Sequence, residues 1–164
     1  MSTIDFPTLV VSSVILLAIV APFIYFIRKS KKQKFEFLSK FEQYVSGLNL
    51  RPELREDWRN RYILAFDKAK NVLIYYQSGE NEEKREISLK EVNRVTVLQT
   101  FLNEDPASGK SKILDQIALQ VQFKNSSQPN LNLEIYNSEY YSDLIGEGVL
   151  AAKWAELINQ HLTK

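Results

Sequence analysis

Residues 9–27, LVVSSVILLAIVAPFIYFI, are nineteen consecutive residues without a charged side chain, and this run constrains the fold more than any other feature. An α-helix rises about 1.5 Å per residue, so the run makes a helix of roughly 28 Å, close to the hydrocarbon thickness of a bilayer, about 30 Å. Ser12 and Ser13 are compatible with such a helix, because a serine hydroxyl can bond to the carbonyl one turn earlier. Pro22 can bend the last turn, which spanning helices tolerate. The run therefore predicts a transmembrane helix over residues 9–27.

A cleaved signal peptide is the main alternative for this run. A signal peptide has a positively charged start, a shorter apolar core and small residues at its cleavage site. Here residues 1–8 contain no lysine or arginine, and Ala21 is followed by Pro22 and bulky aromatic residues. The pattern favours a retained anchor.

Basic residues follow the apolar run at once, and they predict its orientation. This basic collar consists of Arg28, Lys29, Lys31, Lys32 and Lys34. Positive charge is retained on the cytoplasmic side of a membrane, so we expect residues 1–8 to form a short extracytoplasmic tail and the soluble part to lie in the cytoplasm of the cell. The collar can also attract anionic lipid headgroups, at about 1 kcal/mol per basic residue.

An amphipathic helix is predicted directly after the collar, within residues 28–47. Apolar side chains recur at helical spacing over residues 33–46, and Gly47 is a suitable helix end. This helix either continues the spanning helix or folds back after it. Its apolar face has three possible partners, namely the bilayer, a partner helix or the domain that follows, and the domain is the default expectation.

The remaining chain, residues 48–164, has the pattern of a small α+β domain. Residues 48–60 carry mixed charges around Pro52 and Trp58 and predict a polar turn or short helix. Six later segments have the composition, alternation and flanking turns of strands: residues 61–67, 72–77, 85–89, 93–101, 117–123 and 131–136. Asn71 suits a left-handed turn position between the first two. A terminal helix is predicted from the stripe formed by Leu150, Trp154, Leu157, Ile158 and Leu162.

This order of short, mostly antiparallel strands and one C-terminal helix with a central tryptophan resembles the pleckstrin-homology-like fold. The residues that carry the resemblance are the hairpin at 62–76, ISLKEVNRVTV at 87–97, IALQVQF at 117–123, LNLEIY at 131–136 and AAKWAELI at 151–158. The resemblance implies an antiparallel β-sandwich or open barrel capped by the helix. It also implies binding of headgroups, peptides or proteins, with catalysis rare. Fold alone does not assign a function.

The chain departs from headgroup-binding members of that fold in its first hairpin. Those members cluster basic residues there, whereas this chain has Lys68 and Lys70 in the turn and no basic residue in the following strand, VLIYYQ. The departure argues against specific phosphoinositide binding, and two solvated turn residues are the simpler interpretation.

Composition excludes several functional classes. The chain has no cysteine, which removes disulfides, thiolate metal sites and a thiol nucleophile. Residues 1–34 carry a net charge of +4, whereas the rest carries 16 basic and 19 acidic residues. A mildly acidic domain behind a basic collar does not have the basic surface of a nucleic-acid binder, so no nucleic-acid partner is expected.

No catalytic, metal or cofactor site is predicted. His161 is the one histidine, and a cation in the last turn of a helix has a structural explanation. Residues 108–111, Ser-Gly-Lys-Ser, lack the earlier glycine of a phosphate-binding loop. The acids Glu80, Glu82 and Glu83 lack calcium-loop spacing, and the Asn125-Ser-Ser127 acceptor pattern has no meaning in a cytoplasmic domain.

Two tyrosine pairs are the candidate protein-contact residues, namely Tyr75–Tyr76 and Tyr140–Tyr141. Neighbouring strand residues point to opposite faces, so one member of each pair must face away from the core side. An exposed tyrosine is a good contact anchor, although a half-buried surface tyrosine is the more ordinary outcome.

Three functions are consistent with these features. The first is a non-enzymatic, membrane-anchored binding or scaffold module that contacts another membrane-associated protein. The second is a sensor of anionic lipid that uses the collar with Lys68 and Lys70. The third is a tethered enzyme that uses carboxylates such as Glu53, Asp57 or Asp67, for which nothing in the sequence pairs the acids.

Overall fold

The computed structural model describes residues 6–79, 81–102 and 113–162. Residues 1–5 of the predicted tail, Glu80 and residues 103–112, which include the Ser-Gly-Lys-Ser motif at 108–111, lie outside the described residues. The chain divides into two compact units, residues 1–49 and residues 50–164.

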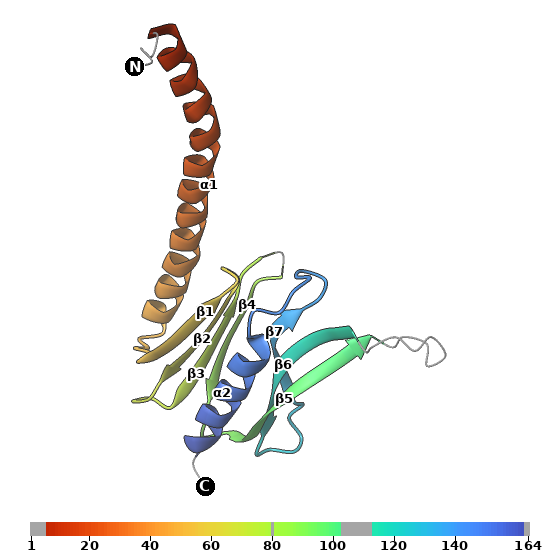
Figure 1. The fold of residues 1–164 in the computed structure, drawn as a ribbon. Helices are drawn as coiled ribbons and strands as arrows, with labels where there is room; N and C mark the ends of the chain where they lie inside the picture. The colour runs from red at the N-terminus through yellow and green to blue at the C-terminus, as the bar shows by residue number, and fades with distance from the viewer. Residues whose placement is uncertain (1–5, 80, 103–112, 163–164) are drawn as a thin grey trace, which may run out of the picture. The chain divides into compact units, whose positions relative to one another are not determined.

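The first unit is one long helix, α1 (Phe6–Gly47), shown in Figure 1. The predicted spanning and amphipathic segments are therefore continuous, and the helix ends at Gly47 as predicted. The Ser13 hydroxyl donates to the carbonyl of Leu9 at 2.8 Å, as a serine in an apolar helix is expected to do. Pro22 lies inside the helix.

The N-terminal part of α1 has the length and composition of a membrane span. Within the described residues, this is the helix that is long and apolar enough to cross a bilayer. Its large apolar side chains between Leu9 and Ile27 are 38–66% exposed. Apolar surface on this scale is unfavourable in water, which makes hydrocarbon the better solvent for this segment.

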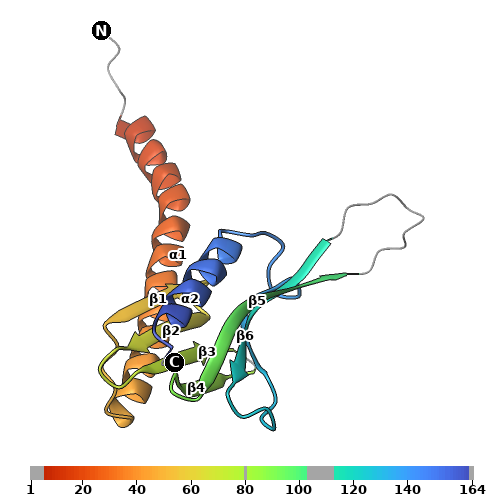
Figure 2. The ribbon, with the colours of Figure 1, turned by 90° about the horizontal axis from the view of Figure 1, so that it is seen from below.

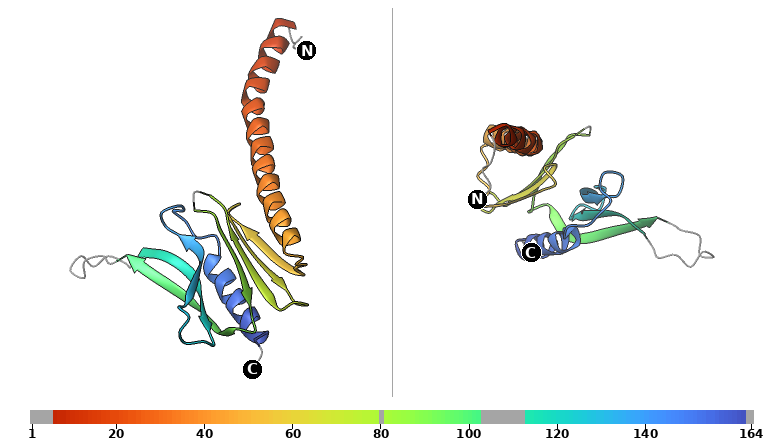
Figure 3. Two further views of the ribbon diagram at one scale, coloured as in Figure 1. Left: turned by 180° about the vertical axis from the view of Figure 1, so that it is seen from behind. Right: turned by 45° about the horizontal axis from the view of Figure 1, so that its top comes forward.

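The second unit contains two antiparallel sheets and one helix, so it confirms the α+β fold class. Sheet A has four strands in chain order: β1 (Leu54–Trp58), β2 (Tyr62–Asp67), β3 (Val72–Gln77) and β4 (Glu83–Ser88). Sheet B has three: β5 (Val92–Leu102), β6 (Ile113–Phe123) and β7 (Leu131–Asn137). The chain ends in α2 (Glu147–Gln160). Figures 2 and 3 show the two sheets and α2 from other sides.

The six predicted strands all form, and β1 is a seventh that the sequence did not predict. Residues 54–58 were expected within a polar turn or short helix, and this expectation is wrong. The strand forms because it pairs with β2 along its length, from Leu54 opposite Phe66 to Trp58 opposite Tyr62. Pairing with a buried strand outweighs the weak local preference of a charged segment.

Tight turns set the register of sheet A. Asn71 has φ 58° in the β2–β3 turn, the left-handed conformation expected for it. Arg59 and Asn60 have φ 56° and 49° in the β1–β2 turn, where asparagine accepts this conformation better than arginine does. These turns place residues 59–61 and the β3–β4 connection at the same end of sheet A.

The core lies between the sheets and is closed on one side by α2. Its buried members come from both sheets and from α2, including Leu64, Leu119 and Trp154. The indole Nε1 of Trp154 donates to Glu56 of β1 at 2.9 Å, and Asn159 bonds to the backbone of Val95 on β5. The helix therefore bridges β1 at one edge of sheet A and β5 at one edge of sheet B. The other two edges, β4 and β7, are bridged by no helix among the described residues.

Candidate functional site

The β domain has a groove between the edge strands β4 and β7. It consists of two hollows of about 550 Å³ and 410 Å³, both lined by residues of β4 and β7 and both including Arg85. We call this feature the β4–β7 groove. Its polar half is lined by Gln77, Asn81, Glu82, Glu83, Arg85, Gln116, Asn132, Glu134, Asn137, Glu139 and Tyr140. Its other half is lined by Arg85, Glu86, Ile87, Ser88, Glu91, Phe123, Gln128, Pro129, Asn130 and Leu131.

The carboxylate of Glu134 organises the polar half. Its Oε1 accepts hydrogen bonds from the Tyr62 hydroxyl at 2.7 Å and from Gln77 Nε2 at 3.3 Å. Its Oε2 accepts from Asn137 Nδ2 at 2.9 Å and from Gln116 Nε2 at 3.1 Å. Four neutral donors from β2, β3, β6 and the end of β7 therefore meet at one acid. They tie the two sheets together beneath the groove.

Two buried tyrosines act as donors in this network. Burial raises the pKa of Tyr62 far above its ordinary value, and the hydrogen bond to Glu134 raises it further. Burial also raises the pKa of Tyr75, with the negative charge of Glu134 as the next cause. Both hydroxyls therefore keep their protons at neutral pH and remain donors, which suits a structural network better than proton transfer.

Aromatic side chains from sheet A also bond to the backbone of β7. The Tyr75 hydroxyl lies 2.8 Å from the carbonyl oxygen of Glu134, and Trp58 Nε1 donates to the carbonyl of Ile135 at 2.9 Å. These bonds satisfy carbonyl groups at the edge of sheet B. They close the space between the sheets below the polar half of the groove.

Tyr140 lies at the rim of the groove, and Arg61 packs against its ring. The guanidinium carbon of Arg61 lies 3.9 Å from the centre of the Tyr140 ring and 5.6 Å from that of Tyr62. This is a cation–π arrangement, in which ring faces rather than a carboxylate contact the charge. Gly79 has φ 124°, a backbone conformation that L side chains rarely adopt, so the turn after β3 favours glycine here. Tyr140 is 38% exposed and lines the groove.

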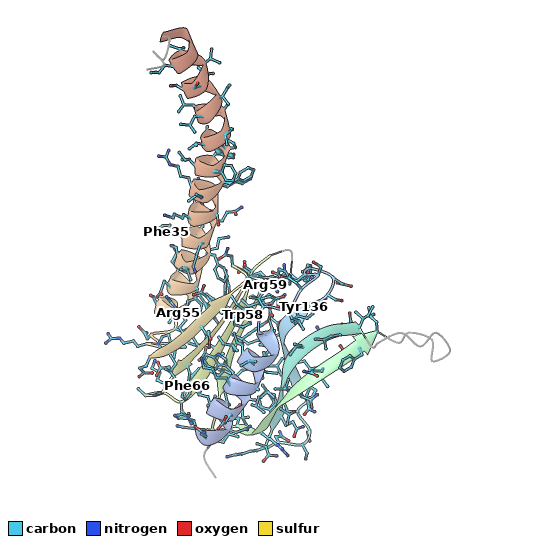
Figure 4. The ribbon with its side chains drawn as sticks, in the orientation of Figure 1. Phe35, Arg55, Trp58, Arg59, Phe66 and Tyr136 are labelled. Atoms are coloured by element: carbon cyan, nitrogen blue, oxygen red, sulfur yellow. The ribbon has the colours of Figure 1, made fainter. Side chains whose placement is uncertain are left out.

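A second arginine fixes the neighbouring loop to α2. Arg59 Nε lies 2.7 Å from Glu147 Oε1, and its Nη1 lies 3.1 Å from Asp143 Oδ1. Desolvation lowers the pKa of Arg59, but the two carboxylates raise it above its ordinary value, so the charge is retained. The guanidinium also stacks on Tyr141 at 4.5 Å. Figure 4 shows Trp58 and Arg59 at this loop end and Phe66 toward the opposite end.

The two predicted tyrosine pairs differ in their exposure to solvent. Tyr75 and Tyr76 are 0% exposed, so neither presents surface to a partner. Tyr140 is at the rim of the groove, and Tyr141 is half-buried against Arg59. Contact with a partner stays a prediction for Tyr140 and Tyr141.

The other predicted residues have distinct environments. All five collar residues, Arg28, Lys29, Lys31, Lys32 and Lys34, are exposed on α1. Lys68 and Lys70 lie in the β2–β3 turn, with the backbone N–H of each bonded to a carboxylate. His161 Nδ1 lies 2.8 Å from the Leu157 carbonyl, and its ring packs edge-on against Phe66.

Of the acids considered for catalysis, Glu53 and Asp67 each bond to backbone N–H groups. Glu53 accepts from the backbone of Lys68, and Asp67 accepts from the backbones of Arg51 and Lys70. Among the described residues, no group of three or more acids or histidines is arranged to hold a metal ion.

Among the residues that line the groove, Tyr140 is a contact candidate from the sequence, whereas Gln77, Gln116 and Glu134 are not. The alternation of residues 131–136 predicts a solvent-facing side chain at Glu134, and it gives no indication that Gln77 and Gln116 meet this acid. Gln77 follows five apolar or aromatic residues, VLIYY, and Glu134 lies between Leu133 and Ile135. A long polar side chain in such a strand can indicate a buried hydrogen bond. The partner of both glutamines is Glu134, which lies 57 residues from Gln77 and 18 from Gln116, so the sequence does not reveal it. Comparison with family models, curated proteins and solved structures gave no match.

Proposed function

We propose that this protein is a non-enzymatic binding or scaffold module, anchored in the cell membrane by α1, whose β domain holds another membrane-associated protein. The observation that carries the proposal is the β4–β7 groove, a surface hollow with an acidic centre and an exposed tyrosine at its rim. Concave surfaces with a few fixed polar groups and an aromatic anchor are typical binding sites. The exposed apolar side chains of residues 9–27 support the anchor.

The fold family is part of the proposal. A four-stranded sheet, a three-stranded sheet and a terminal helix with a buried Trp154 are the arrangement expected of a pleckstrin-homology-like domain. Members of that fold commonly bind proteins, peptides or headgroups. The arrangement supports a binding role over a catalytic one, and the groove supplies the surface.

The orientation is also proposed. We infer that the N-terminus lies outside and the β domain in the cytoplasm, because five exposed basic residues follow the apolar run within seven positions. The positive-inside rule places such a cluster on the cytoplasmic side.

Site-specific photo-crosslinking in cells tests the binding role. A photoreactive amino acid replaces Asn132, which is exposed and lines the groove, in the full-length chain. The matched control carries it at Glu156, an exposed position on α2 that does not line the groove. We expect a discrete protein adduct from position 132 and none from position 156. Adducts absent from both, or equal at both, would count against the proposal.

The exposed collar favours a second candidate, a sensor of anionic lipid. Five exposed cations close to a membrane attract acidic headgroups at about 1 kcal/mol each. The test is native mass spectrometry of the full chain reconstituted with equal amounts of phosphatidylglycerol and phosphatidylcholine. Retention of phosphatidylglycerol should fall when the five residues are changed to glutamine. Unchanged retention would remove the collar from this account.

A further inference from the structure

We propose that the β4–β7 groove takes an extended, basic segment of the partner, which adds as a strand along β4. This inference rests on the proposed binding function and names the chemistry of the partner.

The first argument is the direction of the β4 backbone. The N–H of Leu89 donates across to the carbonyl of Asn71, at the end of the β3–β4 pairing. In an antiparallel ladder, alternate residues direct their backbone groups to the same neighbour, so Ile87 and Arg85 also face β3. The Ser88 carbonyl accepts from the N–H of Glu91 at 3.1 Å. The Ser88 N–H and both backbone groups of Glu86 then point away from β3, where sheet A ends. A strand laid beside β4 would meet them.

The second argument is that two other edges are already engaged. The side chain of Asn159 donates to the carbonyl of Val95 at 2.8 Å and accepts from its N–H at 2.9 Å, so it occupies the edge of β5. On β7, the carbonyls of Glu134 and Ile135 accept hydrogen bonds from Tyr75 and Trp58. Of the β4, β5 and β7 edges, β4 is therefore favoured for addition of a strand.

The third argument is charge complementarity. The described lining of the groove carries six acids: Glu82, Glu83, Glu86, Glu91, Glu134 and Glu139. Arg85 is the one base in that lining, and its Nε lies 2.7 Å from Glu83. Glu82 is also paired, with Lys84 Nζ at 2.5 Å. The two pairs neutralise two of the six acids, so the lining keeps a net negative charge. Lysine or arginine side chains of a partner would meet this field favourably, and acidic ones would be repelled.

The fourth argument is the apolar floor of the other half. Ile87, Phe123, Pro129 and Leu131 line it. Side chains on one face of a strand repeat every second residue, about 7 Å apart. A segment that places basic residues toward the Glu134 end and an apolar residue toward Ile87 would fit both halves. The charges on β4 itself discourage pairing with an unmatched strand.

The test measures peptide binding to the full chain in phosphatidylcholine nanodiscs, which remove anionic lipid as a competitor. The probe is a fluorescein-labelled ten-residue peptide, (Lys-Val)₄-Lys-Leu, and the comparison peptide has glutamate at every lysine. Fluorescence anisotropy should show saturable binding of the basic peptide, weakening with added salt, and none of the acidic one. No binding of the basic peptide up to about 1 mM would overturn the inference.

Matched charge reversals locate the site. Glu82→Lys and Glu139→Lys lie in the groove, whereas Glu156→Lys makes the same change at an exposed position on α2. We expect each groove variant to weaken binding about tenfold, which corresponds to about 1.4 kcal/mol, and the α2 variant to change it less than twofold. Equal weakening by all three would show attraction to overall charge and would overturn the assignment.

Amide hydrogen exchange tests the strand addition. The bound peptide should slow exchange at Glu86 and Ser88 and leave the amides of α2 unchanged. Protection confined to β5 or α2 would overturn the β4 assignment. If the crosslink at position 132 forms while this peptide fails to bind, the basic-strand inference fails and the binding function stands.

Discussion

Individual hydrogen-bonding side chains join the two sheets where the strand pairing does not. Tyr62, Tyr75 and Trp58 each reach from sheet A to β7, and each bonds to a single oxygen there. Because these groups are buried or half-buried, losing one leaves an acceptor without its partner in a place that water reaches poorly. The contribution of each residue is therefore measurable.

Replacement of Tyr75 by phenylalanine should destabilise the β domain. The change removes the hydroxyl that lies 2.7 Å from Gln77 Oε1 and 2.8 Å from the Glu134 carbonyl. We expect a loss of about 1–3 kcal/mol in the free energy of unfolding, measured by thermal denaturation of the full chain in micelles. Tyr140→Phe keeps its ring over Arg61 at the exposed rim and should change stability by less than about 0.5 kcal/mol. Equal losses would contradict the assignment.

Asp67 makes the stability of the domain depend on pH. Burial raises its pKa, but the backbone N–H groups of Arg51, Lys70 and Ala69 outweigh burial, so the folded pKa lies below the ordinary value of 3.8. The stabilisation is therefore present above the unfolded pKa and is lost as pH falls through the folded one. The Tm gap between wild type and Asp67→Asn should be constant near neutral pH and shrink below about pH 4. A gap unchanged down to pH 2 would refute this.

At the scale of elements, α2 is held by a salt bridge at its first turn and by side-chain hydrogen bonds near its last turn. Its first turn receives Arg59 from the β1–β2 turn, and Asn159 near its last turn bonds to the edge of β5. Between them, Trp154 and Ile158 are buried in the core. The helix therefore connects β1 of sheet A with β5 of sheet B. The groove lies between the other two edge strands, β4 and β7.

The Arg59–Glu147 pair should contribute far more than the Arg59–Asp143 pair. The side chain of Glu147 is 4% exposed and that of Asp143 is 64% exposed. Removing Glu147 leaves a poorly solvated cation, so Glu147→Ala should cost about 3 kcal/mol, whereas Asp143→Ala should cost less than about 1 kcal/mol. Chemical denaturation of the two variants measures the difference. Similar losses of stability for the two variants would mean that the Arg59–Glu147 pair is as well solvated as the Arg59–Asp143 pair.

Asn159 should protect the edge of β5. Asn159→Ala removes two hydrogen bonds to Val95, and we expect about 1–2 kcal/mol of destabilisation together with faster exchange of the Val95 amide. Gln160→Ala is the control, because that side chain bonds only to exposed Glu156 among the described contacts. Exchange at Val95 that is equally slow in both variants would argue against edge protection.

At the scale of the whole molecule, one helix combines an apolar segment with a basic collar and leads into the β domain. We propose that the apolar segment drives insertion and that the collar sets its direction. The two properties reside in separate residues, so they can be changed separately.

The proposed membrane orientation predicts which end of the chain is protected from added protease. A C-terminal epitope tag on the full chain should be protected in intact cells and digested after permeabilisation, because the β domain is expected in the cytoplasm. Changing the five collar residues to glutamine should increase the fraction with an accessible tag, since the orientation signal is lost. A tag digested in intact wild-type cells would reverse the proposed orientation.

Local physical signals explain which elements the sequence predicts well. The apolar run at 9–27 is recognisable because hydrophobicity is a property of consecutive residues. The strands at 117–123 and 131–136 show the alternation of one buried and one polar face, and Asn71 occupies the left-handed turn expected for it. Gly47 likewise ends the helix that the spacing of apolar side chains predicts.

What only the tertiary structure decided are contacts between residues far apart in the chain. The strand β1 exists because it pairs with β2, and its own residues give little local preference for a strand. Glu134 meets Tyr62 across 72 positions, and Arg59 meets Glu147 across 88. Such contacts depend on the register of two sheets and on where a helix crosses them. A groove that these arrangements create has no signature in any short stretch of sequence, whereas a membrane-length apolar helix is complete within one.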